Sequence, residues 1–107
     1  MREIFIFKEI GNKDFAENKD AGQEIRLKKI MPELENGDEI ILNFEKIDRA
    51  SQSFIHSLIS EPIRKYGADK ALDFIIFKGC NSTVKTMINI VLDYLQDALR
   101  ENEEDKK

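Results

Sequence analysis

The residues able to do chemistry in this chain are few. His56 is the only histidine and Cys80 the only cysteine. Acid–base or nucleophilic catalysis needs a second group within hydrogen-bonding reach, and neither residue has a recognisable partner motif beside it. At helical spacing His56 shares an arc with Ser57, Ser60 and Arg64, away from the apolar stripe, so we expect it at the surface. We therefore predict no catalytic residue, metal or cofactor.

Known nucleotide and phosphoacceptor motifs are also missing. There is no glycine-rich dinucleotide fingerprint and no P-loop lysine motif. A receiver domain needs an acidic pair after its first strand and a phosphoacceptor aspartate after a later one, and the segments here read "KEIG" and "NFEKI". Cys80 precedes an expected helix start, which can lower a thiol pKa. Without a histidine motif nearby, a reactive thiol is a minor alternative.

The densest polar stretch is "EKIDRASQS", residues 45–53, between an apolar run and a helical stripe. Ser51 is a good helix N-cap. Capping needs only one hydroxyl, so it leaves Ser53 and the neighbouring Arg49 unexplained. We expect this junction to face a protein partner, with the contact made by Asp48, Arg49, Ser51, Gln52, Ser53, His56 and Ser57.

A second polar loop, "KGCNSTV" at residues 78–84, also opens a helix, and Asn81 or Ser82 suits its N-cap. Helix N-termini offer free N–H groups and the positive end of the helix dipole. An alternative function is therefore a phosphate, nucleotide or small-molecule sensor. Its anion site would be formed by Ser53, Asn81, Ser82 and Thr83.

Three apolar runs predict the strands that must position these loops: residues 4–7, 40–44 and 72–77. The second and third are nearly continuous, which is typical of strands buried on both faces of a parallel sheet. Apolar stripes at helical spacing follow each strand, at residues 27–34, 54–66 and 84–99. The order predicts an α/β fold, a small mainly parallel or mixed sheet of three to five strands packed with three main helices. The strands at 39–44 and 72–77 should be parallel, and adjacent or nearly so.

Local details refine this prediction. We expect a kink or an early stop at Pro32 and at Pro62, because proline lacks a donor and clashes with the preceding turn. Residues 8–20 are a loop, or a hairpin with a short strand around Phe15. The predicted core includes Phe54, Leu58, Ile75 and Ile88.

The helix at 84–99 has a wide apolar arc. Met87, Ile90, Tyr94 and Ala98 extend its stripe to about half of the circumference. Either this helix is sunk into a crevice between the sheet and a neighbouring helix, or it contacts a second protein chain, with a homodimer as one form.

Length and charge set the remaining expectations. The 107 residues predict a single domain over residues 1–99 and a charged, frayed tail over residues 100–107. The net charge of −4 argues against nucleic-acid and anionic-membrane partners. A single cysteine excludes an internal disulfide and fits a reducing cytoplasm. No apolar run is long enough to span a membrane.

The run "AGQEIRLKKIMPEL", then "DEIILNFEKIDRASQSFIHSLI", and later "NSTVKTMINIVLDYL" resembles the STAS-like domains of uncharacterised bacterial proteins, the DUF4325 group. The family pattern has a G-x-x-(I/L/F)-R helix, a strand ending in aspartate or asparagine plus an apolar residue, and a Ser-Phe helix start. The likeness covers about residues 20–99. The matching residues are Gly22, Ile25 and Arg26, then Asn43 and Phe44, then Ser53 and Phe54.

The resemblance implies a small α/β domain related to the anti-sigma-factor antagonists, which bind histidine-kinase-type ATPases. In those proteins a serine at the start of the helix after the central strand is the switch, and its phosphorylation breaks binding. Alignment of the two helix starts puts Gln52 at the phosphoserine position and Ser53 where a second serine stands. The resemblance thus implies a regulatory, partner-binding module. It leaves the serine switch without its usual residue and makes Ser53 and Ser51 the candidate phosphorylation sites.

Overall fold

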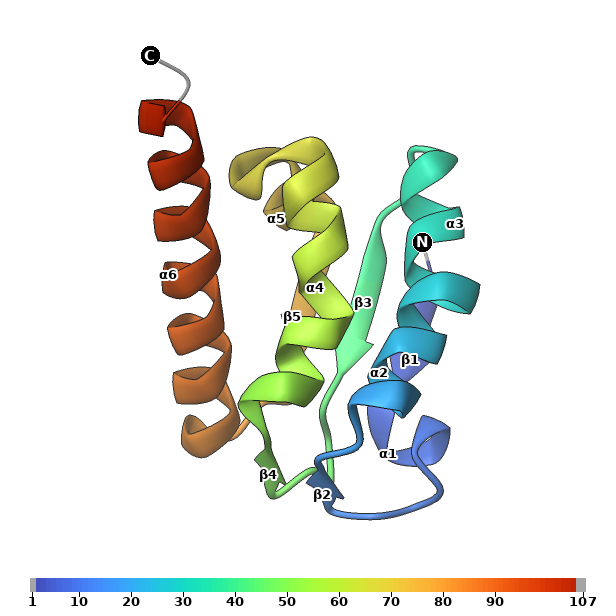
Figure 1. The fold of residues 1–107 in the computed structure, drawn as a ribbon. Coiled ribbons are helices and arrows are strands. Elements are labelled where there is room, and N and C mark those ends of the chain that lie inside the picture. Colours follow the sequence, from blue (N-terminus) through green and yellow to red (C-terminus); the bar gives the residue numbers. More distant parts are fainter. Residues whose placement is uncertain (1, 106–107) are drawn as a thin grey trace.

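The computed structural model describes residues 2–105, with side chains described as far as residue 98 (Figure 1). Strands and helices alternate along most of the chain, as the apolar pattern predicts. The elements are β1 (Arg2–Phe5), α1 (Ile6–Glu9), β2 (Phe15–Ala16), α2 (Lys19–Ile25), the π-helical segment η1 (Arg26–Ile30), α3 (Met31–Glu35), β3 (Ile40–Asn43), β4 (Arg49–Ala50), α4 (Gln52–Tyr66), α5 (Ala68–Phe74), β5 (Ile75–Lys78) and α6 (Ser82–Asp105).

The main sheet is parallel, with strand order β1-β3-β5. Leu42 of the central strand lies opposite Ile4 on one side and Phe77 on the other. The predicted parallel and adjacent pairing of the second and third strands is therefore confirmed, as is the α/β class. A second, two-stranded parallel pair joins β2 to β4, with Phe15 opposite Arg49. The short strand around Phe15 exists, but it forms no hairpin.

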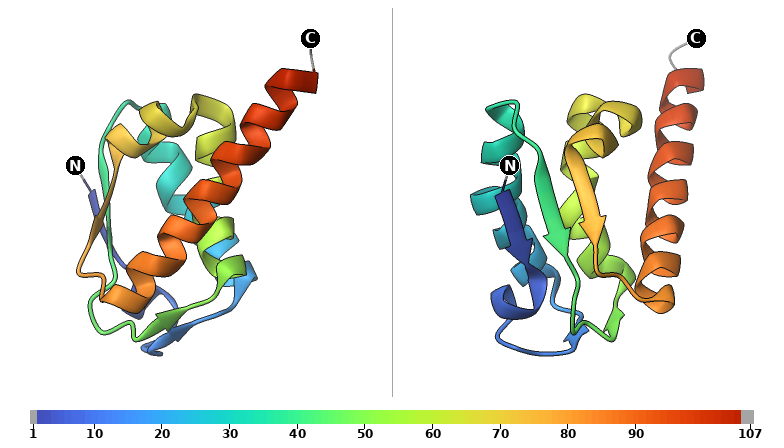
Figure 2. Two further views of the ribbon diagram at one scale, coloured as in Figure 1. Left: turned by 90° about the vertical axis from the view of Figure 1, so that its left-hand side faces the viewer. Right: turned by 180° about the vertical axis from the view of Figure 1, so that it is seen from behind.

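Helices cover only one face of the three-stranded sheet, and the other face is bare of them (Figure 2). Strand alternation places Ile41 and Ile76 on the bare face, where the Ile76 side chain is 37% exposed. The expectation that these strands are buried on both faces is wrong for this sheet. In this sheet a continuous apolar run does not mean that both faces are buried. Apolar side chains fill the face covered by helices, and others lie on the bare face.

Two strand boundaries differ from the prediction. The run at residues 4–7 is split, because Ile6 begins the helical turn α1 and is fully buried there. The run at residues 72–77 is split as well, since Leu72 to Phe74 complete α5 and the strand starts at Ile75. In both cases the apolar side chains are buried by a helical turn that packs against the core. An apolar run alone cannot distinguish such a turn from a strand.

The two prolines lie inside helical runs that continue past them. Pro32 follows η1, where the wider π turn accommodates the missing donor and ring of a proline. Pro62 is buried within α4, which continues to Tyr66. An early stop is therefore wrong for both, and the local disturbance at Pro32 takes the form of the π segment.

The core lies between the sheet and the helices. Phe54 and Leu58 of α4 are fully buried, and Ile75 and Ile88 are 3% and 5% exposed, as predicted. This places α4 directly over the sheet, with its first turn at the edge where the strands end (Figure 1).

α6 lies along the side of α4 rather than in a crevice (Figures 1 and 2). Val91 and Leu95 of α6 are buried, whereas Ile90 is 46% and Tyr94 56% exposed. The crevice explanation for the wide apolar arc is therefore wrong, and contact with a second chain stays a prediction. The charged segment at 100–107 is helical as far as Asp105, and residues 106–107 lie outside the described part.

Candidate functional site

The two predicted polar loops meet at the carboxyl edge of the sheet, where α4 and α6 begin (Figure 1). Asn81 joins them: its amide nitrogen donates to the carbonyl of Asp48 at 2.9 Å and to that of Ile47 at 3.4 Å. Its side-chain oxygen accepts from the Val84 N–H at 2.8 Å, so Asn81 is the N-cap of α6. Every polar atom of this side chain is thus used inside the protein.

Ser51 is the N-cap of α4, as predicted. Its hydroxyl oxygen accepts from the Phe54 N–H at 3.1 Å, and the hydroxyl donates to the Glu17 carbonyl at 3.3 Å. The Ser51 N–H donates to the Ala16 carbonyl at 2.8 Å, which ties the helix start to β2. Ser51 is therefore part of the framework, and a phosphate on its oxygen would break the cap.

Gln52 and Ser53 form the first turn of α4 and are exposed. Within the part of the chain whose side chains are described, neither side chain has a hydrogen-bond partner. Their N–H groups precede the first intrahelical bond and point out of the helix end. Gln52 and Ser53 therefore carry polar groups that capping does not use.

Asp48 and Arg49 are held beside this turn. Both of their N–H groups donate to the Asp14 carbonyl, at 2.8 Å and 3.3 Å. The Arg49 guanidinium lies over the Phe15 ring, 4.2 Å from its centroid, in a cation–π contact. The small β2–β4 pair therefore fixes the backbone of an exposed Asp48 and an exposed Arg49 just before the first turn of α4.

His56 and Ser57 lie in different surroundings. The His56 ring is half-buried against Tyr94 of α6, with ring centroids 6.4 Å apart. Burial, and then the nearby Arg64 charge, lower its pKa. Ser57 is 5% exposed and donates to the Phe54 carbonyl at 2.6 Å. As a partner contact Ser57 is wrong, because its hydroxyl lies beneath the surface; Ser60, expected on the same outer arc, is equally buried.

The sequence reasoning missed what Ser57 does. Gly22 of α2 packs directly on it, and a Cβ at Gly22 would stand 1.9 Å from the Ser57 hydroxyl oxygen. One turn later Arg26 donates to the Ser57 carbonyl at 3.3 Å and pairs with Glu61 at 2.9 Å. Gly22, Arg26, Ser57 and Glu61 form what we call the α2–α4 clasp. Its sequence signal is the glycine one helical turn before an arginine.

A similar close approach explains Asn43 and Gly79. Asn43 is 2% exposed; it donates to the Glu3 carboxylate at 2.8 Å and accepts from the Glu45 N–H at 2.8 Å. Gly79 has φ +72°, and a Cβ there would stand 2.8 Å from the Asn43 side-chain oxygen. The Asn43 hydrogen bond, and then the charge of Lys78, lower the pKa of Glu3.

The predicted anion site is poorly equipped to bind anions. Ser82 and Thr83 are exposed in the first turn of α6, but Asn81 is fully used. A hollow of 350 Å³ beside them is lined by two carboxylates, Asp14 and Asp48, and one cation, Lys46. The charge balance of this hollow disfavours a phosphate.

Cys80 is half-buried, and burial raises the pKa of its thiol although Lys85 opposes the shift. The protonated thiol is a weak nucleophile. Among the described residues, no group of three or more histidine, cysteine or acidic side chains could hold a metal ion.

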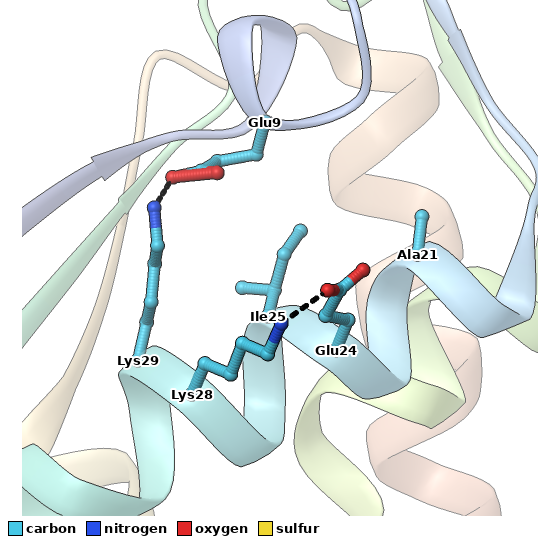
Figure 3. Close-up of a pocket in the computed structure, with 6 residues that line it drawn as sticks. All are labelled: Glu9, Ala21, Glu24, Ile25, Lys28 and Lys29. Atoms are coloured by element: carbon cyan, nitrogen blue, oxygen red, sulfur yellow. Dashed lines mark hydrogen bonds and ion pairs between the residues drawn. The ribbon is translucent and has the colours of Figure 1, made fainter.

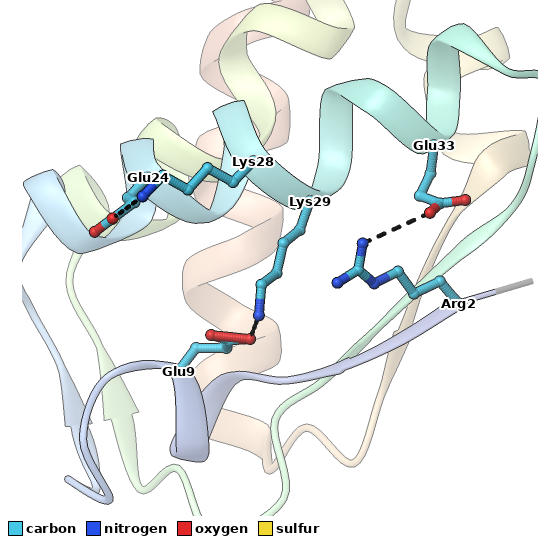
Figure 4. Close-up of polar contacts among 6 residues, drawn as sticks. All are labelled: Arg2, Glu9, Glu24, Lys28, Lys29 and Glu33. Atoms are coloured by element: carbon cyan, nitrogen blue, oxygen red, sulfur yellow. Dashed lines mark hydrogen bonds and ion pairs between the residues drawn. The ribbon is translucent and has the colours of Figure 1, made fainter.

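A hollow of 340 Å³ between α1 and the α2–η1 run is lined by charged residues that already neutralise one another (Figure 3). Lys29 pairs with Glu9, and Lys28 lies 2.5 Å from Glu24. Further along, Arg2 pairs with Glu33 at 3.6 Å, which ties β1 to α3 (Figure 4). These contacts hold the first strand against the helical layer.

None of the helices in the described part of the chain is both long and apolar enough to cross a membrane.

Comparison with known proteins finds a family for most of the chain. The model of one family, described as a STAS-like domain of unknown function (DUF4325), matches residues 21–85. This span runs from the start of the α2–α4 clasp through the junction to the first turn of α6. No curated protein and no solved structure matches the chain. Since the match covers more than half of the 107 residues, the chain belongs to the family of STAS-like domains.

Proposed function

We propose that this chain is a non-enzymatic regulatory module that binds a protein partner through the start of α4. The binding region, which we call the junction surface, consists of Asp48, Arg49, Gln52, Ser53 and His56. Ser51 supports it as the helix cap. The partner class that we favour is a histidine-kinase-type ATPase or another signalling protein.

The observation that carries this proposal is the surplus of polar groups in the first turn of α4. Ser51 alone caps the helix, so the hydroxyl of Ser53 and the amide of Gln52 are free to meet another molecule. Arg49 and Asp48 lie beside them on a backbone fixed by the Asp14 carbonyl. Exposed groups held on a rigid framework suit recognition, because little side-chain and loop entropy is lost on binding.

A non-catalytic role agrees with the chemistry available. His56 packs on Tyr94 and, among the described residues, is hydrogen-bonded to no serine or cysteine; burial disfavours the Cys80 thiolate. An acidic chain with exposed hydroxyls at one helix start is better suited to protein recognition than to transfer chemistry.

A binding titration tests this proposal. The full chain would first be used to capture partners from extracts of its source cells, and the purified ATPase or signalling protein would then be titrated with wild type and Ser53→Asp. We expect Ser53→Asp to remain folded, since a negative charge suits a helix N-terminus. Its affinity should fall because an unmatched charge must be desolvated at the contact.

Ser82→Asp is the matched control, because it adds the same charge to the first turn of α6. Its affinity should stay near that of wild type. Equal affinities for wild type and Ser53→Asp, with both proteins folded by thermal unfolding, would remove the junction surface from the interface.

A further inference from the structure

A groove lies between β5 and α6. The two elements diverge from the turn that joins them (Figure 2). Its volume is 640 Å³. The walls are largely apolar and come from both elements and from the end of α5. They include Leu72, Ile75, Phe77, Ile88 and Leu92.

The narrow end of the groove is positively charged. Lys85 and Lys78 line it beside Gly79, and no carboxylate is among the lining residues. Lys78 also pairs with Glu3 at 3.4 Å, so Lys85 carries most of the uncompensated charge. This contrasts with the net charge of −4 for the whole chain. A ligand that complements the groove therefore carries a negative charge close to an apolar portion.

β5 also offers main-chain hydrogen bonds. The Lys78 carbonyl accepts from the Phe44 N–H at 2.8 Å, so the main-chain groups of Lys78 face the β3 side. Since successive residues of a strand present these groups to opposite sides, those of Phe77 face the groove side. Within residues 2–105, no strand pairs with this edge of β5. An extended chain supplies both a donor and an acceptor in matching register.

We propose that the β5–α6 groove binds an extended peptide segment of a partner protein, which adds to the sheet as a strand beside β5. Its apolar side chains fill the groove and a carboxylate meets Lys78 and Lys85. This second docking site stands independently of the junction surface, from which it is separated by the α6 cap.

Selection from a displayed library of random nine-residue peptides tests this proposal on the full chain. We expect peptides with a carboxylate next to apolar residues to be enriched. Their affinity, measured by fluorescence anisotropy, should fall about tenfold or more in a Lys78→Gln, Lys85→Glu double variant, since charge complementarity is lost. Lys70→Glu, an exposed charge reversal on α5 outside the groove, is the matched control and should bind as wild type does. Ser53→Asp should also bind as wild type does.

Main-chain pairing has its own signature. N-methylation at alternate positions of a selected peptide should abolish binding, while methylation at the positions between should be tolerated, because a strand directs alternate N–H groups at its neighbour. Peptides that bind the double variant equally well, or that ignore N-methylation, would overturn the proposal. So would concentration-dependent self-association that Lys85→Glu abolishes, since the occupant would then be a second copy.

Discussion

Helices α2 and α4 pack without free space between them, whereas a groove with space for another chain lies between α6 and β5. At the first contact a single added Cβ on Gly22 would stand 1.9 Å from the Ser57 hydroxyl. At the second, a groove of 640 Å³ opens between apolar walls. The same short chain therefore contains one interface that is complete and one that is open.

The contrast between the clasp and the groove distinguishes residues that hold the fold together from residues that are available for binding. The family match, residues 21–85, contains the whole α2–α4 clasp, the junction surface and the β5 side of the groove, while Ile88 and Leu92 of the groove wall lie beyond it. Residues of the clasp act on stability through packing and an ion pair. In the open region Ile75 and Ile88 belong to the core, but Lys78 and Lys85 are exposed, so substitution of the two lysines should alter binding with little effect on folding.

The largest effect on stability should come from removing a buried side chain next to the α2–α4 clasp. Phe54→Ala removes a fully buried ring below the clasp and should reduce the free energy of unfolding by about 3–5 kcal/mol. Leu92→Ala, in the half-buried groove wall, should reduce it by only about 1–2 kcal/mol. Urea unfolding of both variants measures the contrast, and equal losses would show that the groove wall is as tightly packed as the core.

Filling the clasp should have the next largest effect. Gly22→Ala forces the new methyl group onto Ser57, and we expect a loss of about 1–3 kcal/mol despite the better helix propensity of alanine. Adding Ser57→Ala removes the hydroxyl at the clash. The double variant should therefore lose less than the sum of the single ones in a double-mutant cycle. Additive losses would mean that the two helices move apart freely.

The two serines at the start of α4 should differ in their effect on stability, by a smaller amount. Ser51→Ala removes the cap and should reduce the free energy of unfolding by about 1 kcal/mol. Ser53→Ala should change it by less than about 0.5 kcal/mol, because its hydroxyl bonds to nothing in the described structure. Thermal unfolding of the pair is the measurement. A larger loss for Ser53→Ala would assign Ser53 to the framework and weaken the case for the junction surface.

The smallest effect concerns the bare face of the sheet, where Glu3 meets Asn43 and Lys78. These contacts hold the pKa of Glu3 below its ordinary value of 4.5, so the folded protein binds this proton less readily than the unfolded chain. The stabilisation is present above pH 4.5 and is lost as the pH falls through the lowered pKa. The melting temperature of wild type should therefore exceed that of Glu3→Gln at pH 7, with the gap closing in acid. A gap that is constant down to pH 3 would assign the difference to packing.

Local patterns were enough to predict much of the fold. The apolar runs located the three strands of the main sheet, and helical periodicity identified Phe54 and Leu58 as core. Cap chemistry identified Ser51, because the hydrogen bond it makes spans only three residues. Such features depend on neighbours in sequence and are therefore readable from it.

The misses depend on partners far away in the chain. Ser57 looked exposed because its own helix places it beside His56, and only α2 with Gly22 covers it. Ile6 and Phe74 were predicted to lie in strands, because an apolar run does not reveal whether a strand or a helical turn will bury its side chains. The bare face of the sheet was equally invisible, since apolar residues such as Ile76 stand on it.

The parallel sheet has a consequence for how the chain is made. Each strand pairs only with a distant one: Arg2 lies opposite Ile40, and Ile40 opposite Ile75. No hairpin can form early, and long loops must close before any ladder bond of the main sheet is gained, which slows folding relative to a helical bundle. During synthesis β1 therefore waits for β3, and β3 keeps an unpaired edge until residues 75–78 have left the ribosome. Over that interval the unpaired edge of β3 can pair with other nascent chains that are being translated from the same mRNA.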